Sequence, residues 1–163
     1  MRPDFFYDNH KLGTMKLEHY LSKFNSFDEF EKQFPQEFLD DDCRVGDYLR
    51  TLWIKDGARP VSVVSEEAYQ DTSYLRKIIN DRNENPKTPK RDALICFCIA
   101  LKASIEDLQC VLKYAGYQPL YVRRRKDVVI WYGIMKHENI LTIDDNLRKR
   151  GLQPIISDKK LGL

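Results

Sequence analysis

The chain matches itself when it is shifted by 35 residues, and this internal repeat restricts the possible folds more than any other feature of the sequence. Residues 90–120 align without a gap with residues 125–155, and each copy contains two apolar stripes at helical spacing. Both copies end in Gly-x-Gln-Pro and an aliphatic residue, and glycine is typical of the position just after a helix. We therefore predict a two-helix hairpin that occurs twice and stacks through its apolar stripes. The alternative is chance similarity between two amphipathic hairpins.

A shorter apolar stripe precedes the repeat. Leu75, Ile78 and Ile79 lie at i, i+3 and i+4 and predict a helix at about 72–80. A helix of about two to three turns is unstable alone in water, so this one must dock through its stripe, and its polar face is left for a partner. The loop that follows contains Pro89, which suits the first turn of the next helix. The residues that can cap the short helix are Asp71, Thr72 and Ser73.

Further helices are predicted on both sides of this stretch. Residues 45–56 carry an apolar stripe that ends before Gly57, and residues 61–69 form the next helix. Ser104, with Asp107 three residues later, predicts a variant of the capping box at the start of another helix. The pattern is helical throughout this part of the sequence.

Residues 1–42 are acidic and rich in aromatic residues. Apolar residues recur at helical spacing between Leu17 and Phe34, and Ser26 with Glu29 can start a second helix there. The segment is too apolar for a disordered tail, so we predict a helical extension. It either packs on the rest of the protein, which we favour, or provides a surface for a dimer or another partner.

The sequence SYLRKIIN, followed by a polar loop with a proline and by RDALICFCIALKASIEDLQCVLKYAG, resembles the second half of a phage-repressor-type (Cro/cI, Xre-like) helix-turn-helix domain. GYQPLY with the arginine-rich linker after it is similar to the layout of some Xre-like regulators. The resemblance covers roughly residues 45–116. It implies an all-α, lambda-repressor-like bundle at 43–117, between the N-terminal extension (1–42) and a C-terminal hairpin (118–163), with a recognition helix at about 72–80.

The chain differs from the family pattern at the turn before the expected recognition helix. The family usually has glycine and then an aliphatic residue there, whereas this chain has Tyr69 and Gln70. Glu66 and Glu67 on the preceding helix would lie near DNA phosphates in a standard docking. We therefore expect the turn and these two carboxylates to decide whether the family's mode of binding applies.

The net charge of +2 is unevenly distributed along the chain. Residues 72–126 carry twelve Lys and Arg against five Asp and Glu, whereas residues 1–71 carry nine against fifteen. A localised basic surface is typical of proteins that contact nucleic-acid phosphates. The alternative is that these charges form an ordinary solvated face.

The resemblance implies that the polar face of the helix at about 72–80 contacts base edges and phosphates. The basic cluster at 123–126 either extends the phosphate surface or starts the next helix. The candidate DNA-binding residues are Thr72, Ser73, Tyr74, Arg76, Lys77 and Asn80, flanked by Arg82, Lys87, Lys90 and Arg91.

Several classes of protein are excluded by what the sequence lacks. It contains no P-loop, dinucleotide-binding, zinc-protease or nucleophile-elbow motif, so we do not expect an enzyme. The four cysteines form no C-x-x-C pair and the three histidines are scattered, so we expect neither a metal site nor a cofactor. Because there is no run of eighteen apolar residues and no signal peptide, we expect a cytoplasmic protein with reduced thiols and no membrane contact.

These expectations lead to a function and an alternative. The first is a sequence-specific transcriptional regulator that binds double-stranded DNA as a homodimer, because half-site recognition needs two recognition helices at a fixed spacing. The alternative is a protein-interaction module, antitoxin-like or a regulatory adaptor, that has the fold without DNA binding. The N-terminal aromatic segment would then be a surface for its protein partner.

Overall fold

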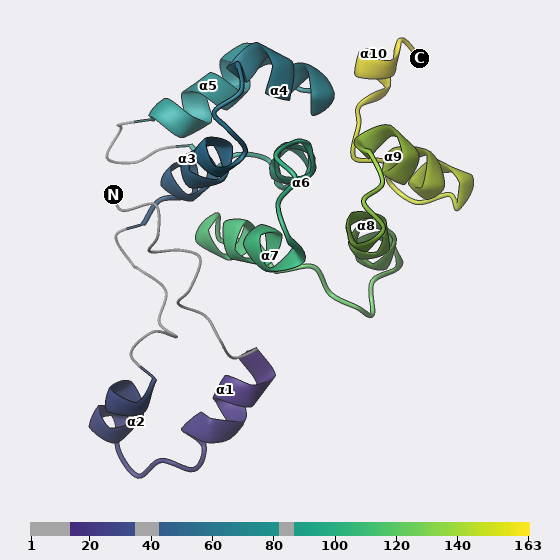
Figure 1. Ribbon diagram of the computed structural model, residues 1–163. Coiled ribbons are helices and arrows are strands. Elements are labelled where there is room, and N and C mark those ends of the chain that lie inside the picture. The colour runs from purple at the N-terminus through teal and green to yellow at the C-terminus, as the bar shows by residue number, and fades with distance from the viewer. Residues whose placement is uncertain (1–13, 35–42, 82–86) are drawn as a thin grey trace. The chain divides into compact units, whose positions relative to one another are not determined.

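The computed structural model describes residues 14–34, 43–81 and 87–163. Every regular element in these ranges is an α-helix, so the predicted all-α fold is confirmed (Figure 1). The chain divides into two compact units, Met1–Cys43 and Arg44–Leu163. Of the helices in the described ranges, none is long and apolar enough to cross a membrane.

The first unit contains a small aromatic cluster. Its helices are α1 (Thr14–Leu21) and α2 (Phe27–Gln33). The hydroxyl of Ser26 accepts a hydrogen bond from the N–H of Glu29 at 3.3 Å, which confirms the predicted cap. The buried ring of Phe30 lies 5.5 Å from that of Phe24 and 5.3 Å from that of Phe34. Among the described side chains of this unit, the large apolar ones that stay exposed are Tyr20, Leu21 and Phe27.

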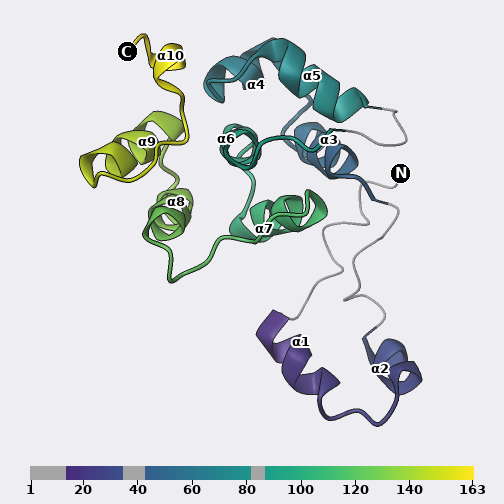
Figure 2. The same ribbon diagram turned by 180° about the vertical axis from the view of Figure 1, so that it is seen from behind.

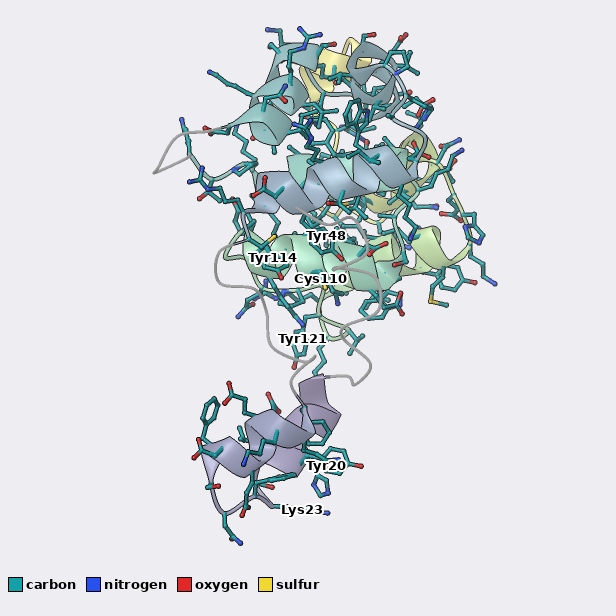
Figure 3. All side chains as sticks on the ribbon, turned by 60° about the vertical axis from the view of Figure 1, so that its left-hand side comes forward. Tyr20, Lys23, Tyr48, Cys110, Tyr114 and Tyr121 are labelled. Carbon is teal, nitrogen blue, oxygen red and sulfur yellow. The ribbon has the colours of Figure 1, made fainter. Side chains whose placement is uncertain are left out.

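The second unit is built around one buried helix. Its helices are α3 (Val45–Lys55), α4 (Val61–Glu67), α5 (Thr72–Asn80), α6 (Arg91–Ala100), α7 (Ile105–Tyr114), α8 (Arg125–Met135), α9 (Ile140–Lys149) and α10 (Asp158–Leu161). Helix α6 lies at the centre, between α4 and α5 on one side and α8 and α9 on the other (Figures 1 and 2). Most of its side chains are buried, which explains why its sequence is apolar all round. On another side of the unit, Tyr48 of α3 faces Tyr114 of α7, and the Tyr48 hydroxyl donates to the carboxylate of Asp107 at 3.0 Å (Figure 3).

Three of the helix pairs are joined by the same tight corner. The pairs are α4–α5, α6–α7 and α8–α9. In each corner the helix is followed by its C-cap residue, one residue with φ of 53–56°, one further residue and the N-cap of the next helix. The positive-φ residues are Tyr69, Lys102 and His137. The backbone bonds that close the corners have lengths of 2.9 Å and join Gln70 to Ser65, Ala103 to Cys98 and Glu138 to Gly133. Tyr69 thus takes the left-handed conformation that favours glycine.

Each copy of the 35-residue repeat contains two helices and a return segment held in an equivalent way. Gln109 holds the strand-like return after α7, because its side chain accepts from the N–H of Leu120 at 2.7 Å and donates to the carbonyl of Leu120 at 3.1 Å. Asp144 occupies the same position in the second copy and accepts from the N–H groups of Ile155 and Ile156 at 2.8 and 2.9 Å. Gly116 and Gly151 close the two copies with φ of 79° and 66°, as predicted for left-handed caps.

The two copies contact each other reciprocally. Arg91 of the first copy pairs with Asp127 of the second at 3.2 Å, and Lys126 of the second pairs with Asp92 of the first at 2.9 Å. Equivalent residues that exchange contacts in this way indicate an approximate two-fold relation. The two copies therefore meet about an approximate two-fold axis, and the prediction of stacked hairpins had specified no such relation.

The two-fold relation leaves one apolar helix face uncovered. Ala93, Phe97 and Ala100 of α6 are buried, and the ring of Phe97 lies 6.1 Å from that of Tyr74 on α5. The equivalent side chains of α8 are 41–56% exposed, and they are Val128, Tyr132 and Met135. This face of α8 has no counterpart of α4 and α5 within the described part of the second unit.

Candidate nucleic-acid interface

Helix α5 is docked as its stripe predicts. Leu75, Ile78 and Ile79 are buried and pack against α3 and α4. Helix α3 approaches the last turn of α5 so closely that a Cβ on Gly46 would lie 2.2 Å from the carbonyl oxygen of Ile78. The position of α5 therefore depends on backbone contact as well as on side-chain burial.

The start of α5 differs from the predicted cap. Asp71 occupies the N-cap position, but its side chain makes no capping hydrogen bond to the first turn. Its carboxylate pairs with Lys160 of α10, 89 residues further along the chain, and this pair lowers the pKa of Asp71. The α10 lysine thus offsets the negative charge at the N-terminus of α5, a role that no local pattern indicated.

The outward face of α5 is polar and basic. Ser73, Arg76 and Lys77 are exposed, and Thr72 is half-buried. Asn80 is also exposed, and its amide oxygen accepts a hydrogen bond from Arg50 of α3 at 3.3 Å. Four exposed candidates and the half-buried Thr72 thus share one face with no carboxylate among them.

Tyr74 anchors the segment before α6 to α5. Its hydroxyl accepts from the N–H of Lys90 at 2.8 Å, and the hydroxyl of Tyr117 donates to the carbonyl of Pro89 at 2.7 Å. Lys87 and Lys90 are exposed on this anchored segment. Pro89 precedes the N-cap Lys90 rather than occupying the first turn of the helix, so its predicted position was two residues out.

Two flanking candidates differ from the others. Arg91 is half-buried and holds Asp127, so it links α6 to α8 and its charge is already compensated. Arg82 lies outside the described residues. The basic cluster at 123–126 spans two elements. Arg123 and Arg124 are exposed in the linker, whereas Arg125 and Lys126 start α8.

The carboxylates of α4 are partly neutralised. Arg59 pairs with Glu67 at 2.8 Å and with Asp56 at 2.7 Å, and it donates to the carbonyl of Ala100 at 2.8 Å. Glu66 remains exposed. Of the two carboxylates of α4, only Glu67 is therefore paired with Arg59, and Glu66 is the one that would repel a phosphate.

The cysteines of α6 have a structural role. Cys96 and Cys98 are buried, and burial raises the pKa of Cys96 to about 12 and also raises the pKa of Cys98. A thiol with such a pKa is almost entirely protonated at neutral pH, so neither is a nucleophile or a ready metal ligand. No group of three or more possible metal ligands occurs among the residues whose side chains are described.

The raised thiol pKa values predict that stability falls in alkali. Above about pH 8.5 the unfolded chain releases thiol protons that the folded chain retains, so each buried thiol lowers the free energy of unfolding by about 1.4 kcal/mol per pH unit. Urea unfolding followed by tryptophan fluorescence measures this in the second unit, which contains both tryptophans, Trp53 and Trp131. The free energy of unfolding of Cys98→Ala should fall less steeply with pH than that of the unsubstituted protein. Equal free energies of unfolding of the unsubstituted protein at pH 8 and pH 10 would contradict the prediction.

No protein-family model matches this chain, and neither a curated protein nor a solved structure matches it. The similarity to phage-repressor-type domains thus stays a prediction from the sequence, and the fold rests on the helices described above.

Proposed function

We propose that the protein is a sequence-specific DNA-binding transcriptional regulator of the helix-turn-helix type, with α5 as its recognition helix. The observation that carries the proposal is the polar, carboxylate-free face of α5, with Arg76 and Lys77 exposed and the lysines of the Tyr74-anchored segment beside it. A helix held by its apolar side presents such a face to a DNA groove. Lysine and arginine side chains beside it suit phosphate contacts.

The corner between α4 and α5 supports this proposal. Tyr69 takes the left-handed conformation that the helix-turn-helix turn requires, although the residue is not glycine. The same corner recurs at Lys102 and His137, so the corner alone does not distinguish a DNA-binding pair from the other hairpins. The charge and exposure of α5 therefore carry the assignment.

We also propose that the regulator acts as a homodimer in a reducing cytoplasm. One copy presents one recognition helix, whereas operators with two half-sites need two helices at about one helical turn of DNA or a multiple of it. Sedimentation of the free protein and of its complex with a palindromic duplex tests this, and a strictly one-to-one complex with a half-site would contradict it.

Replacing Arg76 and Lys77 together with alanine should weaken duplex binding by about tenfold or more at low salt. Each lost phosphate contact reduces the slope of log K against log salt by about one. Fluorescence anisotropy of a labelled duplex between about 50 and 200 mM salt measures both effects.

A matched variant controls for loss of charge alone. Lys136→Ala with Arg150→Ala removes the same charge from exposed positions at the ends of α8 and α9. This control should keep the affinity of the unsubstituted protein within about twofold, since nonspecific attraction changes little. Equal affinity for the α5 variant and the unsubstituted protein would rule out α5 as the contact helix.

The alternative, a protein-interaction module without DNA binding, is favoured by the exposed apolar faces. Val128, Tyr132 and Met135 form one on α8, and exposed aromatic side chains occur in the first unit. Absence of duplex binding at low salt, together with a protein partner that is lost when residues 1–42 are removed, would favour this function over the regulator.

A further inference from the structure

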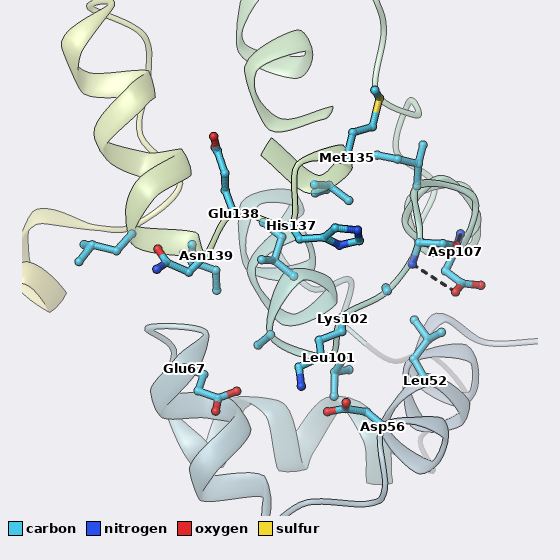
Figure 4. Close-up of a pocket in the computed structure, with 18 of the residues that line it drawn as sticks. Leu52, Asp56, Glu67, Leu101, Lys102, Asp107, Met135, His137, Glu138 and Asn139 are labelled. Carbon is cyan, nitrogen blue, oxygen red and sulfur yellow. Dashed lines mark hydrogen bonds between the residues drawn. The ribbon is translucent and has the colours of Figure 1, made fainter. Parts of the chain in front are cut away.

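The second unit contains a hollow that the proposed DNA contact does not use. It has a volume of about 1130 Å³ and lies where the ends of α3, α4, α6 and α8 meet the starts of α7 and α9 (Figure 4). This is the size of a site for a small organic ligand. Its apolar lining includes Leu52, Leu101, Ile105, Ile134, Met135 and Ile140.

Strained residues converge on this hollow. Within the described residues, four that are not glycine have a positive φ: Ala58, Tyr69, Lys102 and His137. The last three are the corner residues, and all three line the hollow. A side chain at such a φ costs free energy that glycine avoids, and strain of this kind gathers at ligand sites. The corners thus retain an aromatic, a cationic and an imidazole side chain at a cost in stability.

The polar groups that face the hollow differ in how far they are engaged. The side chains of Lys102 and His137 make no hydrogen bond or ion pair with another described residue, and in Figure 4 the His137 imidazole points into the hollow. Tyr69 also lines the hollow, so the lining includes three side chains that carry hydrogen-bond donors beside apolar residues. A ligand with acceptor atoms at one end and an apolar body fits this arrangement.

Most of the acidic groups near the hollow are already held by other groups. Arg59 binds Asp56 and Glu67, and Asp107 accepts from Tyr48. Glu66 and Glu138 are the two carboxylates of the lining that are not held in this way by another described residue. The carboxylate of Glu138 lies beside Gly133 on α8 and points away from His137 (Figure 4). Of these two carboxylates, that of Glu138 is thus directed away from a ligand beside His137.

We propose that this hollow binds a small amphipathic anion, an organic carboxylate with an apolar body, through Lys102, His137 and Tyr69. Tyr69 lies two residues before the N-cap of α5, so the ligand contacts the turn that leads into the candidate recognition helix. The site does not depend on the proposed DNA binding, because its geometry involves no residue of the α5 polar face.

Glycine substitution tests the proposal, because it removes the side chain and relieves the strain at once. The probe is the fluorescent anion 8-anilinonaphthalene-1-sulfonate, displaced by octanoate. Lys102→Gly with His137→Gly should raise the urea midpoint of the second unit and raise the dissociation constant of the probe at least tenfold. Ala58→Gly is the matched control, since it relieves the same strain outside the hollow and should leave probe binding unchanged.

Two further comparisons separate an anion site from a site that is merely apolar. Lys102→Arg keeps the cation and should keep most of the affinity, and octylammonium should displace the probe far less effectively than octanoate. Unchanged probe affinity in the double glycine variant, equal displacement by octylammonium, or a lower urea midpoint would each overturn the proposal. The last result would show that the two side chains serve the fold.

Discussion

Gly46→Ala should destabilise the second unit by about 2–3 kcal/mol, although alanine is the better helix former by about 1 kcal/mol. The reason is the contact between α3 and α5, where the added Cβ would lie 2.2 Å from the carbonyl oxygen of Ile78. The obstructing atom belongs to the backbone, so no rotamer change relieves the overlap. Helix α5 must then move away from α3, and duplex binding should weaken with it.

Urea unfolding with tryptophan fluorescence measures this loss. Gly133→Ala is an informative comparison, because its Cβ would lie 2.4 Å from a side-chain atom, Cγ1 of Ile143. Ile143→Ala removes both Cγ1 and Cδ1, so it should cost less stability in Gly133→Ala than in the unsubstituted protein, whereas Ile78→Ala should cost as much in Gly46→Ala as it does alone. A gain in stability on Gly46→Ala would mean that α3 and α5 are further apart than described.

Asp144→Ala should cost about 3–5 kcal/mol, which is the largest effect expected of a single polar residue here. Asp144 is 1% exposed and accepts from the N–H groups of Ile155 and Ile156 and from Arg148. Removing its carboxylate leaves two buried donors unpaired and releases the segment after α9. The guanidinium of Arg148 also loses one of its two carboxylate partners.

The neighbouring residue provides the control for this effect. Asp145 is exposed and pairs only with Lys149 one turn later among the described residues, so Asp145→Ala should cost less than about 0.5 kcal/mol. Calorimetry and urea unfolding of the two variants compare them directly. Similar losses for Asp144→Ala and Asp145→Ala would contradict the account of the repeated return segment.

Local patterns predicted the helices well. The stripe of Leu75, Ile78 and Ile79 placed α5, and Ser104 placed the start of α7 with its capping box, because periodicity and capping are properties of neighbouring residues. The 35-residue repeat is a local pattern of the same kind, since each copy has two apolar stripes and a glycine near its end. These features needed no knowledge of which helices meet.

Contacts between residues that are far apart in the chain could not be predicted from the sequence. The pairing of Asp71 with Lys160 and the bond from Lys90 to Tyr74 depend on how helices pack, which no spacing rule encodes. The repeat did contain one usable signal, since Arg91-Asp92 and Lys126-Asp127 occupy equivalent positions as basic–acidic pairs. Reciprocal exchange between such pairs is a simple way for two copies to meet.

The structure separates the candidate site residues into those that face outward and those that hold the fold together. Arg76 and Lys77 face outward, whereas Tyr74 and Arg91 hold other parts of the protein in place. Variants of Tyr74 and Arg91 would therefore reduce duplex binding by destabilising the protein. The stability of these variants must be measured together with their affinity. Variants of the first pair should change affinity alone.

Amide chemical shifts recorded during titration with a mixed-sequence DNA duplex at low salt test whether α5 contacts DNA. We expect the largest shifts at α5, around Ser73 to Lys77, and at the anchored segment from Lys87 to Lys90. Shifts confined to the outer face of α8 or to the first unit, or no shifts at all, would contradict a DNA-binding role for α5.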